Sequence, residues 1–212
     1  MHPSTVPTTG SARTTTLRGL AGTASVLVWV AVLGPLSMSA SSLSFGWSQR
    51  TAPARIGMAL MGGGLVFNLL SFLVAGVVVL VWLSRARANA DALYPAPHRL
   101  AAGWAVGGWF VPIGNLVIPM IVVTDVVKAS NPAGRSIPEC GLWWTGWIGG
   151  NLALPMASLF LVSTGGRGGA GVLAISLLLA ALLYGLAAFS FRRIALNVAR
   201  WQDEAASADR LS

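Results

Sequence analysis

Five long apolar segments follow one another along the chain, separated by short polar stretches. They cover residues 17–40, 56–83, 100–127, 141–162 and 170–191. Each is long enough to cross a hydrocarbon core of about 30 Å, which takes about 20 helical residues. A backbone in lipid must satisfy its own hydrogen bonds, so each segment is expected to be helical. The pattern therefore predicts an all-α, polytopic transmembrane helical bundle.

The third apolar segment, residues 100–127, is the most interrupted one. It carries two prolines and a glycine within eight positions, and proline inside a helix removes a hydrogen bond. If this segment enters and leaves on one side of the membrane, eleven of the fourteen basic residues lie on that side. Because cytoplasmic loops carry an excess of Lys and Arg, we predict four spans plus one broken or re-entrant segment, with both chain ends cytoplasmic. Five spans, with six basic residues inside, are the alternative.

The composition indicates that these helices lie in lipid. Of all residues, 55% are hydrophobic and only 9% are charged, against about 25% charged in a soluble domain. The chain thus lacks the polar surface that a water-soluble globule needs. We predict a multi-pass integral protein of the cytoplasmic membrane.

The basic excess changes the expected partner. The net charge is +8, which in a soluble protein would favour nucleic acid. Here most basic residues lie at the ends of apolar segments, where the positive-inside bias and anionic lipid headgroups account for them. The lipid bilayer is therefore the expected partner, and nucleic acid is not. The predicted headgroup contacts are Arg85, Arg87, Arg192, Arg193, Arg200 and Trp201.

The chain divides into four parts. Residues 1–16 are rich in Ser, Thr and Pro, a composition typical of a disordered tail. Residues 17–40 form the first transmembrane segment, which we interpret as an uncleaved signal anchor; a cleaved signal peptide is the alternative. Residues 56–191 form the membrane domain. Residues 192–212 are predicted to be a cytoplasmic amphipathic helix and tail lying along the inner leaflet, because Ile194, Val198 and Trp201 share one helical face.

A heptapeptide occurs twice inside the apolar segments, as "GNLVIPM" at residues 114–120 and "GNLALPM" at residues 150–156. Each proline lies four residues after an asparagine, so in a helix it would leave that asparagine's carbonyl without its donor. We call each such break in the helical hydrogen bonding, with its asparagine and proline, a notch. Unsatisfied polar groups are costly in lipid, so each notch should face protein, water or a ligand.

Two interpretations of these notches stay open. The favoured one is helix packing, supported by two Gly-x-x-x-Gly pairs, at 103 and 107 and at 146 and 150. The other is a polar intramembrane site in broken helices, as in secondary transporters. The candidate residues for either role are Asn68, Gly114, Asn115, Pro119, Gly150, Asn151 and Pro155.

Two acidic residues near the segment ends have expected partners. Asp125 lies three residues before Lys128, so a solvated pair at headgroup level is favoured over a functional intramembrane acid. Arg87 and Asp91 are spaced for an i,i+4 ion pair.

Catalytic and metal-binding signatures are missing from the sequence. Its only histidines are His2 and His98, its only cysteine is Cys140, and no H-E-x-x-H, G-x-S-x-G or phosphate-binding glycine loop with its lysine occurs. We therefore expect no metal, no cofactor and no enzymatic activity.

Four stretches resemble the domain of unknown function 4328 family of actinobacterial polytopic membrane proteins. They are "WLSRARANADAL" (82–93), "WAVGGWFVPIGNLVIP" (104–119), "DVVKASNP" (125–132) and a Trp pair at 143 and 144. The resemblance covers about residues 56–200 and implies that these form one structural unit, but it implies no activity. The matching residues are Trp82, Arg85, Asn89, Trp109, Pro112, Asn115, Pro119, Asp125, Trp143 and Trp144.

The sequence favours a non-catalytic scaffold or accessory subunit that packs with itself, as a homo-oligomer, or with another membrane protein. The alternative is a small transporter or channel that uses the asparagine notches as its polar lining.

Overall fold

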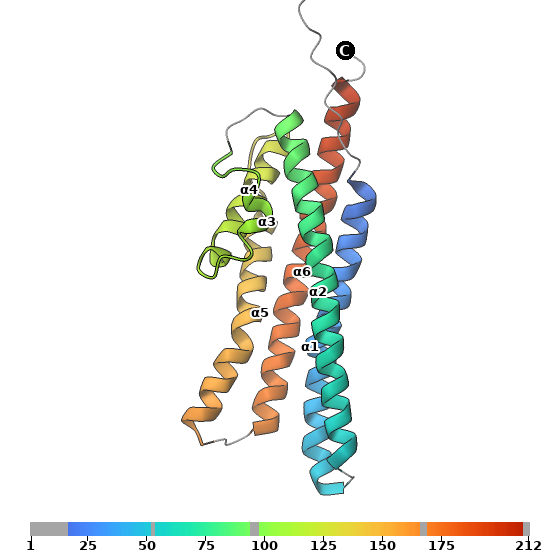
Figure 1. Cartoon of the computed structure of the whole chain (residues 1–212), viewed down its shortest axis with the longest axis vertical. Helices are drawn as coiled ribbons and strands as arrows, with labels where there is room; N and C mark the ends of the chain where they lie inside the picture. Colours follow the sequence, from blue (N-terminus) through green and yellow to red (C-terminus); the bar gives the residue numbers. More distant parts are fainter. Residues whose placement is uncertain (1–16, 52–53, 94–97, 166–168, 210–212) are drawn as a thin grey trace, which may run out of the picture.

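The computed structural model describes residues 17–51, 54–93, 98–165 and 169–209 (Figure 1). This part of the chain is helical and contains no strand, which confirms the all-α prediction. Its elements are α1 (Arg18–Thr51), α2 (Ala54–Leu93), α3 (Trp104–Gly107), the 3-10 helix η1 (Gly114–Leu116), α4 (Ile118–Ser130), α5 (Pro138–Ser163) and α6 (Gly169–Asp209). The predicted disordered tail, residues 1–16, lies outside the described residues.

Four helices are long and apolar enough to cross a membrane. These are Arg18–Ser42 of α1, Gly62–Leu93 of α2, and the whole of α5 and α6. Helix α1 packs along both α2 and α6, and α6 packs along α5, so the four spans stand in the order α2, α1, α6, α5. We call the end where α1 begins and α6 ends the proximal end, and the opposite end the distal end (Figure 1).

The third apolar segment does not span. Between α2 and α5 the chain forms α3, η1 and α4 at the flank of the bundle, turns well short of the distal end and returns to the proximal end, where α5 begins (Figure 1). We call residues 98–137 the re-entrant element. The predicted arrangement of four spans plus one broken segment is confirmed. Pro119 lies in the first turn of α4, where its missing N–H is tolerated, so this proline starts a helix instead of interrupting one.

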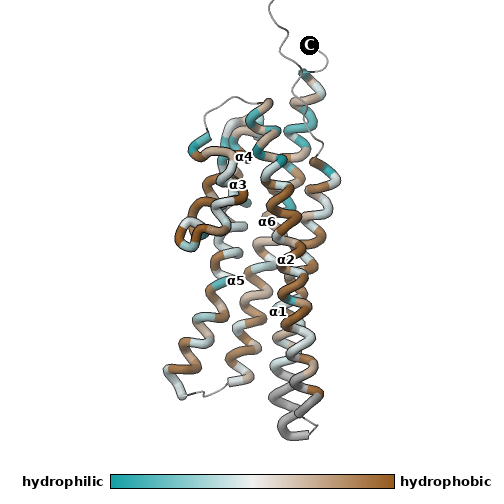
Figure 2. The backbone as a smooth tube through the Cα atoms, in the orientation of Figure 1, coloured by the Kyte–Doolittle hydropathy of each residue, from teal (hydrophilic) through white to brown (hydrophobic). Residues whose placement is uncertain are grey.

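The buried core lies in the proximal half of the bundle. Its members come from α1, α2, the re-entrant element, α5 and α6, and include Leu83, Val126, Trp143 and Phe191. Hydrophilic residues gather at the proximal end of the tube, whereas the spans below it are mainly hydrophobic (Figure 2). Among the described residues, the core cluster does not extend into the distal half.

The final helix differs from the expected amphipathic helix along the inner leaflet. Residues 192–209 continue α6 without a break. Ile194 and Val198 are 0% exposed and belong to the core, and Trp201 packs against it. The apolar face was predicted correctly, but it is covered by protein because α1, α2 and α4 surround this part of α6.

Candidate functional site

The crossing of α1 and α2 explains the first of the candidate polar residues. The side-chain oxygen of Asn68 lies against Gly34, and a Cβ at position 34 would come within 3.0 Å of the Asn68 Cα. Gly34 is followed by Pro35 inside α1, a proline that the sequence reasoning did not consider. Asn68 thus fills a glycine notch in the neighbouring helix.

The α5–α6 crossing rests on two glycines. A Cβ at Gly146 would lie 2.5 Å from the Leu183 carbonyl oxygen, and one at Gly150 would lie 2.6 Å from the Tyr184 ring. The predicted packing role of this glycine pair is confirmed. The same prediction is wrong for the glycine pair at 103 and 107, since a Cβ at either position would meet nothing within 4 Å.

Aromatic rings from four elements meet in what we call the aromatic layer, formed by Phe72, Trp109, Trp143, Trp147 and Tyr184. The rings of Phe72 and Trp147 stack with centroids 5.4 Å apart, and Trp109 meets Trp147 edge-on at 5.6 Å. Tyr184 lies 6.0 Å from Trp147. The layer joins α2 and α5, the two ends of the row, directly through the Phe72–Trp147 stack, and the rings from the re-entrant element and α6 pack against Trp147 as well.

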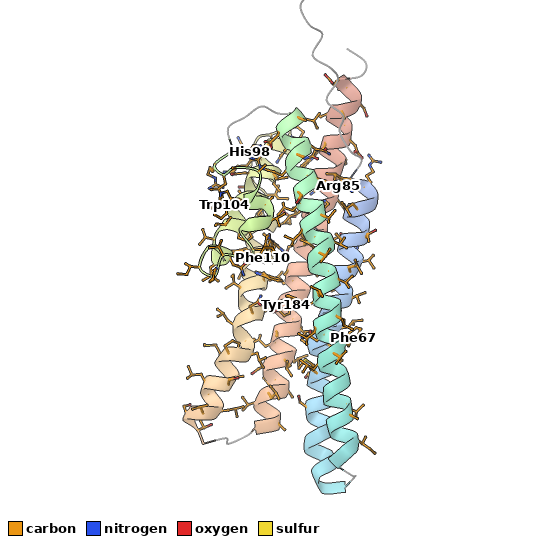
Figure 3. All side chains as sticks on the ribbon, viewed as in Figure 1. Phe67, Arg85, His98, Trp104, Phe110 and Tyr184 are labelled. Atoms are coloured by element: carbon orange, nitrogen blue, oxygen red, sulfur yellow. The ribbon has the colours of Figure 1, made fainter. Side chains whose placement is uncertain are left out.

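The tip of the re-entrant element holds two buried polar atoms without partners among the described residues. They are the Asn115 Oδ1, an acceptor, and the Trp109 Nε1, a donor. The backbone N–H of Asn115 donates to the Val111 carbonyl at 2.7 Å. Figure 3 shows Phe110 at this tip, somewhat closer to the proximal end than Tyr184 of α6.

The second heptapeptide adopts a different conformation from the first. Residues 150–156 stay within α5, with Pro155 in the helix interior. Pro155 has no N–H to donate to the Asn151 carbonyl. The Asn151 side chain is exposed and its Nδ2 donates back to the Trp147 carbonyl at 2.8 Å. The two copies are therefore not equivalent, and the expectation of a helix notch at Asn115 is wrong.

Asn68 and Asn151 nevertheless lie at a common depth. Each is one helical turn distal of an aromatic-layer residue, Asn68 below Phe72 and Asn151 below Trp147. Residues four apart lie on the same side of a helix, so both asparagines lie just below the stacked rings. The candidate intramembrane site is thus the aromatic layer, the partnerless Asn115 Oδ1 in the same re-entrant element as Trp109, and these two asparagines one turn distal of the stacked rings.

A polar cluster at the proximal end fixes the start of the re-entrant element. Arg87 pairs with Asp91 as predicted, and its Nη2 donates to the Leu100 carbonyl at 3.0 Å. The His98 Nε2 lies 3.1 Å from the Asp91 Oδ1. The Arg87 side chain is only 7% exposed, so the expectation that it contacts lipid headgroups is wrong. Its place in this cluster leaves it no path to the surface.

Asp125 also has a partner other than the expected one. It binds Arg99, whose Nε donates to the Asp125 Oδ1 at 2.9 Å, and the pair joins α4 to the entry of the re-entrant element. Lys128 is one turn away on the exposed face and forms no ion pair with it in the part of the chain that the structure describes. The ion pair is therefore a tertiary link and not a solvated local one.

The other four arginines that were predicted to contact headgroups lie at the surface, whereas Trp201 is half-buried against the core. Arg85, Arg192, Arg193 and Arg200 are all exposed. The Arg193 Nη1 lies 3.2 Å from the Glu139 Oε1. Arg200 donates to the Asn197 Oδ1 at 3.3 Å.

Gln202 is a structural residue that the sequence reasoning missed. Its Nε2 donates to the Ala86 carbonyl at 2.9 Å and to the Ser130 Oγ at 2.8 Å. The residue is 1% exposed, and it ties α6 to α2 and to the end of α4. A polar residue on an otherwise apolar helical face was the only available signal.

The pKa of His98 predicts a pH effect on this end of the protein. Burial, and then the charge of Arg87, lower that pKa below its usual 6.5, outweighing Asp91 and Asp125, which raise it. When the pKa of a histidine is lower in the folded than in the unfolded state, the unfolded state binds the proton more readily. The free energy of unfolding is therefore highest above the unfolded-state pKa and decreases as the pH falls from that pKa towards the folded-state pKa. We expect the Tm in detergent to fall between about pH 7.5 and about pH 5.5. His98→Gln should remove that part of the fall, and an equal fall in the variant would contradict the assignment.

The tryptophans of the family resemblance lie in or against the proximal core, whereas Arg85 and Pro112 are exposed. Trp82 is 0% exposed and meets Phe191 edge-on at 5.2 Å. Asn89 is buried, and Trp143 packs between Trp109 and Trp144. Within the described residues no three His, Cys, Asp or Glu side chains gather in a way that could hold a metal ion.

A family model described as "Domain of unknown function (DUF4328)" matches residues 48–203. The match begins before the end of α1 and runs nearly to the end of α6, so it includes the aromatic layer and the polar cluster at the proximal end. No curated protein and no solved structure gave a match.

Proposed function

We propose, from the premise that the chain belongs to the DUF4328 family of domains of unknown function, that it is a non-catalytic scaffold or accessory subunit of the cytoplasmic membrane. Its first partner is a second copy of the same chain. The proximal end, with the re-entrant element and both ends of the described chain, faces the cytoplasm in this proposal, because the basic residues concentrate there.

The observation that carries the proposal is the exposed position of Asn151 at membrane depth. It lies 13 residues into α5, about 20 Å along a helix that crosses the bilayer. Its Nδ2 donates a hydrogen bond within α5, whereas its backbone carbonyl has no N–H donor four residues later, because that residue is Pro155. An exposed amide with a freed carbonyl is costly against lipid tails.

A neighbouring transmembrane helix can supply the hydrogen-bonding groups that lipid tails lack. Polar side chains such as Asn hydrogen-bond between helices in membranes and drive their association by about 0.6–2 kcal/mol per contact. Around Asn151 the exposed face of α5 also carries Leu154, Pro155 and Ser158, which recur at helical spacing. We call these four residues the α5 stripe. Two copies that join through this stripe would bring two Asn151 amides within reach of each other.

Self-association tests the proposal directly. Two copies with different affinity tags are expressed together, and capture of the second tag through the first is measured in mild detergent. We expect Asn151→Leu to reduce the captured copy about three- to tenfold, since one interhelical amide contact is removed. Thr145→Leu is the matched control, because Thr145 is an exposed polar residue of α5 outside the α5 stripe.

Two results would contradict the proposal. One is a wild-type protein that captures no second copy and elutes as a monomer. The other is equal capture by the Asn151 and Thr145 variants.

A second candidate, passage of a small polar solute, is favoured by the Asn115 Oδ1 and the Trp109 Nε1, two buried polar atoms without a partner among the described residues. A solute with both a donor and an acceptor would satisfy these atoms. In that case Asn115→Leu leaves the capture of a second copy intact and removes a solute-dependent rise in Tm. A scaffold without transport shows no such rise in wild-type protein across a panel of small polar solutes.

A further inference from the structure

An open groove runs between α1 and α6 on the outside of the row. It has a volume of about 580 Å³ and is lined by Gly22, Ser25, Val26, Trp29, Val30 and Leu33 of α1 and by Arg192 and Leu196 of α6. We call it the α1–α6 groove. Most of its walls are apolar, Arg192 is its one charged lining residue, and Ser25 already donates its hydroxyl to the Ala21 carbonyl at 2.7 Å. Arg192 is therefore the polar group that a ligand in the groove can bind.

Arg192 lies at the boundary between lipid tails and headgroups. It is 23 residues from the start of α6 at Gly169, which is about 35 Å of helix, against about 30 Å of hydrocarbon. The side chain is exposed. Among the described residues it forms no ion pair, whereas its neighbour Arg193 is paired with Glu139. An uncompensated guanidinium is thus held at the depth of the lipid phosphates.

The length of the groove matches one leaflet. From Gly22 to Leu33 α1 rises by about 16 Å, and half of a hydrocarbon core of about 30 Å is about 15 Å. Gly22 lies early in α1 and Leu196 late in α6, so both belong to the proximal part of the groove, because α1 begins and α6 ends at that end (Figure 1). Val26 and Leu33 are 62% and 51% exposed and supply the apolar wall below.

We propose that the α1–α6 groove is a binding site for one anionic phospholipid of the proximal leaflet. Arg192 binds the headgroup phosphate, and an acyl chain lies along Val26, Trp29 and Leu33. Guanidinium binds phosphate with paired, charge-assisted hydrogen bonds, and the apolar residues of the groove contact the acyl chain. The site is distinct from the α5 stripe, because the groove lies between α1 and α6 and none of its lining residues comes from α5.

Native mass spectrometry of the purified full-length protein tests the proposal. The protein is freed of lipid in detergent and then offered phosphatidylglycerol or phosphatidylcholine with the same acyl chains. We expect one phosphatidylglycerol to bind about tenfold more tightly than phosphatidylcholine, and Arg192→Gln to remove that difference. Arg85→Gln is the matched control, because Arg85 is exposed on α2 at the proximal end (Figure 3), 23 residues after Gly62 and outside the groove.

A second variant separates the tail from the headgroup. Val26→Trp fills the apolar wall at an exposed position, so we expect it to weaken binding of both lipids while leaving the Tm of the lipid-free protein unchanged. Equal loss in the Arg192 and Arg85 variants would mean general headgroup attraction and would overturn the proposal. So would equal binding of the two lipids by the wild-type protein, or no effect of Val26→Trp.

Discussion

Trp82→Ala is expected to destabilise the protein by about 3–5 kcal/mol, the usual cost of removing a buried large aromatic side chain. Trp82 is 0% exposed and packs edge-on against Phe191, so it joins α2 to α6 within the proximal core. Its Nε1 has no hydrogen-bond partner among the described residues. The loss therefore comes from packing and from the cavity left behind, and not from a broken hydrogen bond.

The measurement is the folded fraction of purified protein in mixed micelles with increasing SDS. Trp104→Ala is the control, because Trp104 of α3 is 39% exposed and its removal opens no enclosed cavity. We expect the control to shift the midpoint by less than a third of the Trp82 effect. Equal shifts would show that the proximal core is not the main stabilising contact between α2 and α6.

Gly146→Ala is expected to weaken the α5–α6 contact by about 1–3 kcal/mol, the range for overpacking a tight contact. A Cβ at this position would lie 2.5 Å from the Leu183 carbonyl oxygen and 2.8 Å from the Ala187 nitrogen. Both are backbone atoms of α6, which can give way only if the two helices separate. The gain in helix propensity, up to about 1 kcal/mol, is too small to offset this.

Gly141→Ala on the same helix is the matched control. A Cβ there would meet nothing within 4 Å, so only the gain in propensity remains and we expect the same or slightly higher stability. Opposite signs for the two variants in the same SDS titration are the expected result. A stabilising Gly146→Ala would contradict the close approach of α5 and α6.

The outline of the fold was predictable from hydropathy and from proline positions. The four segments with at most one proline each became spans, and the segment with both Pro112 and Pro119 became the re-entrant element. Periodicity also predicted the apolar face of residues 192–201 correctly. It could not tell whether lipid or protein covers that face, because both are equally apolar partners.

Local sequence was a weaker guide to the individual polar residues. The two heptapeptides share five of seven residues, yet one forms a turn and the start of α4 while the other stays helical. A second proline, Pro112, precedes only the first copy, and Gly146 and Gly150 hold only the second against α6. Neighbouring contacts thus decided the conformation of the same motif.

The spacing of residues along the sequence could not identify hydrogen-bond and ion-pair partners that are distant in the chain. Asp125 was matched with Lys128, which is near in sequence, but binds Arg99, which is 26 residues away. Gln202 joins three helices through bonds to Ala86 and Ser130, and no local pattern pairs those positions. The glycines at 103 and 107 have the spacing of a helix-packing motif but lie at and beside the four-residue helix α3, which has no second helix against them.

Cysteine labelling in intact cells tests whether the re-entrant element enters and leaves at one side of the membrane. In a Cys140→Ser background, single cysteines replace Ala92, Ser136 or Ser163, all of which are exposed. A membrane-impermeant maleimide is added before or after the cells are opened. We expect Ala92→Cys and Ser136→Cys to behave alike and to stay protected until opening, while Ser163→Cys labels from outside. If Ala92→Cys and Ser163→Cys behave alike and Ser136→Cys differs, residues 98–137 cross the membrane and do not form a re-entrant element.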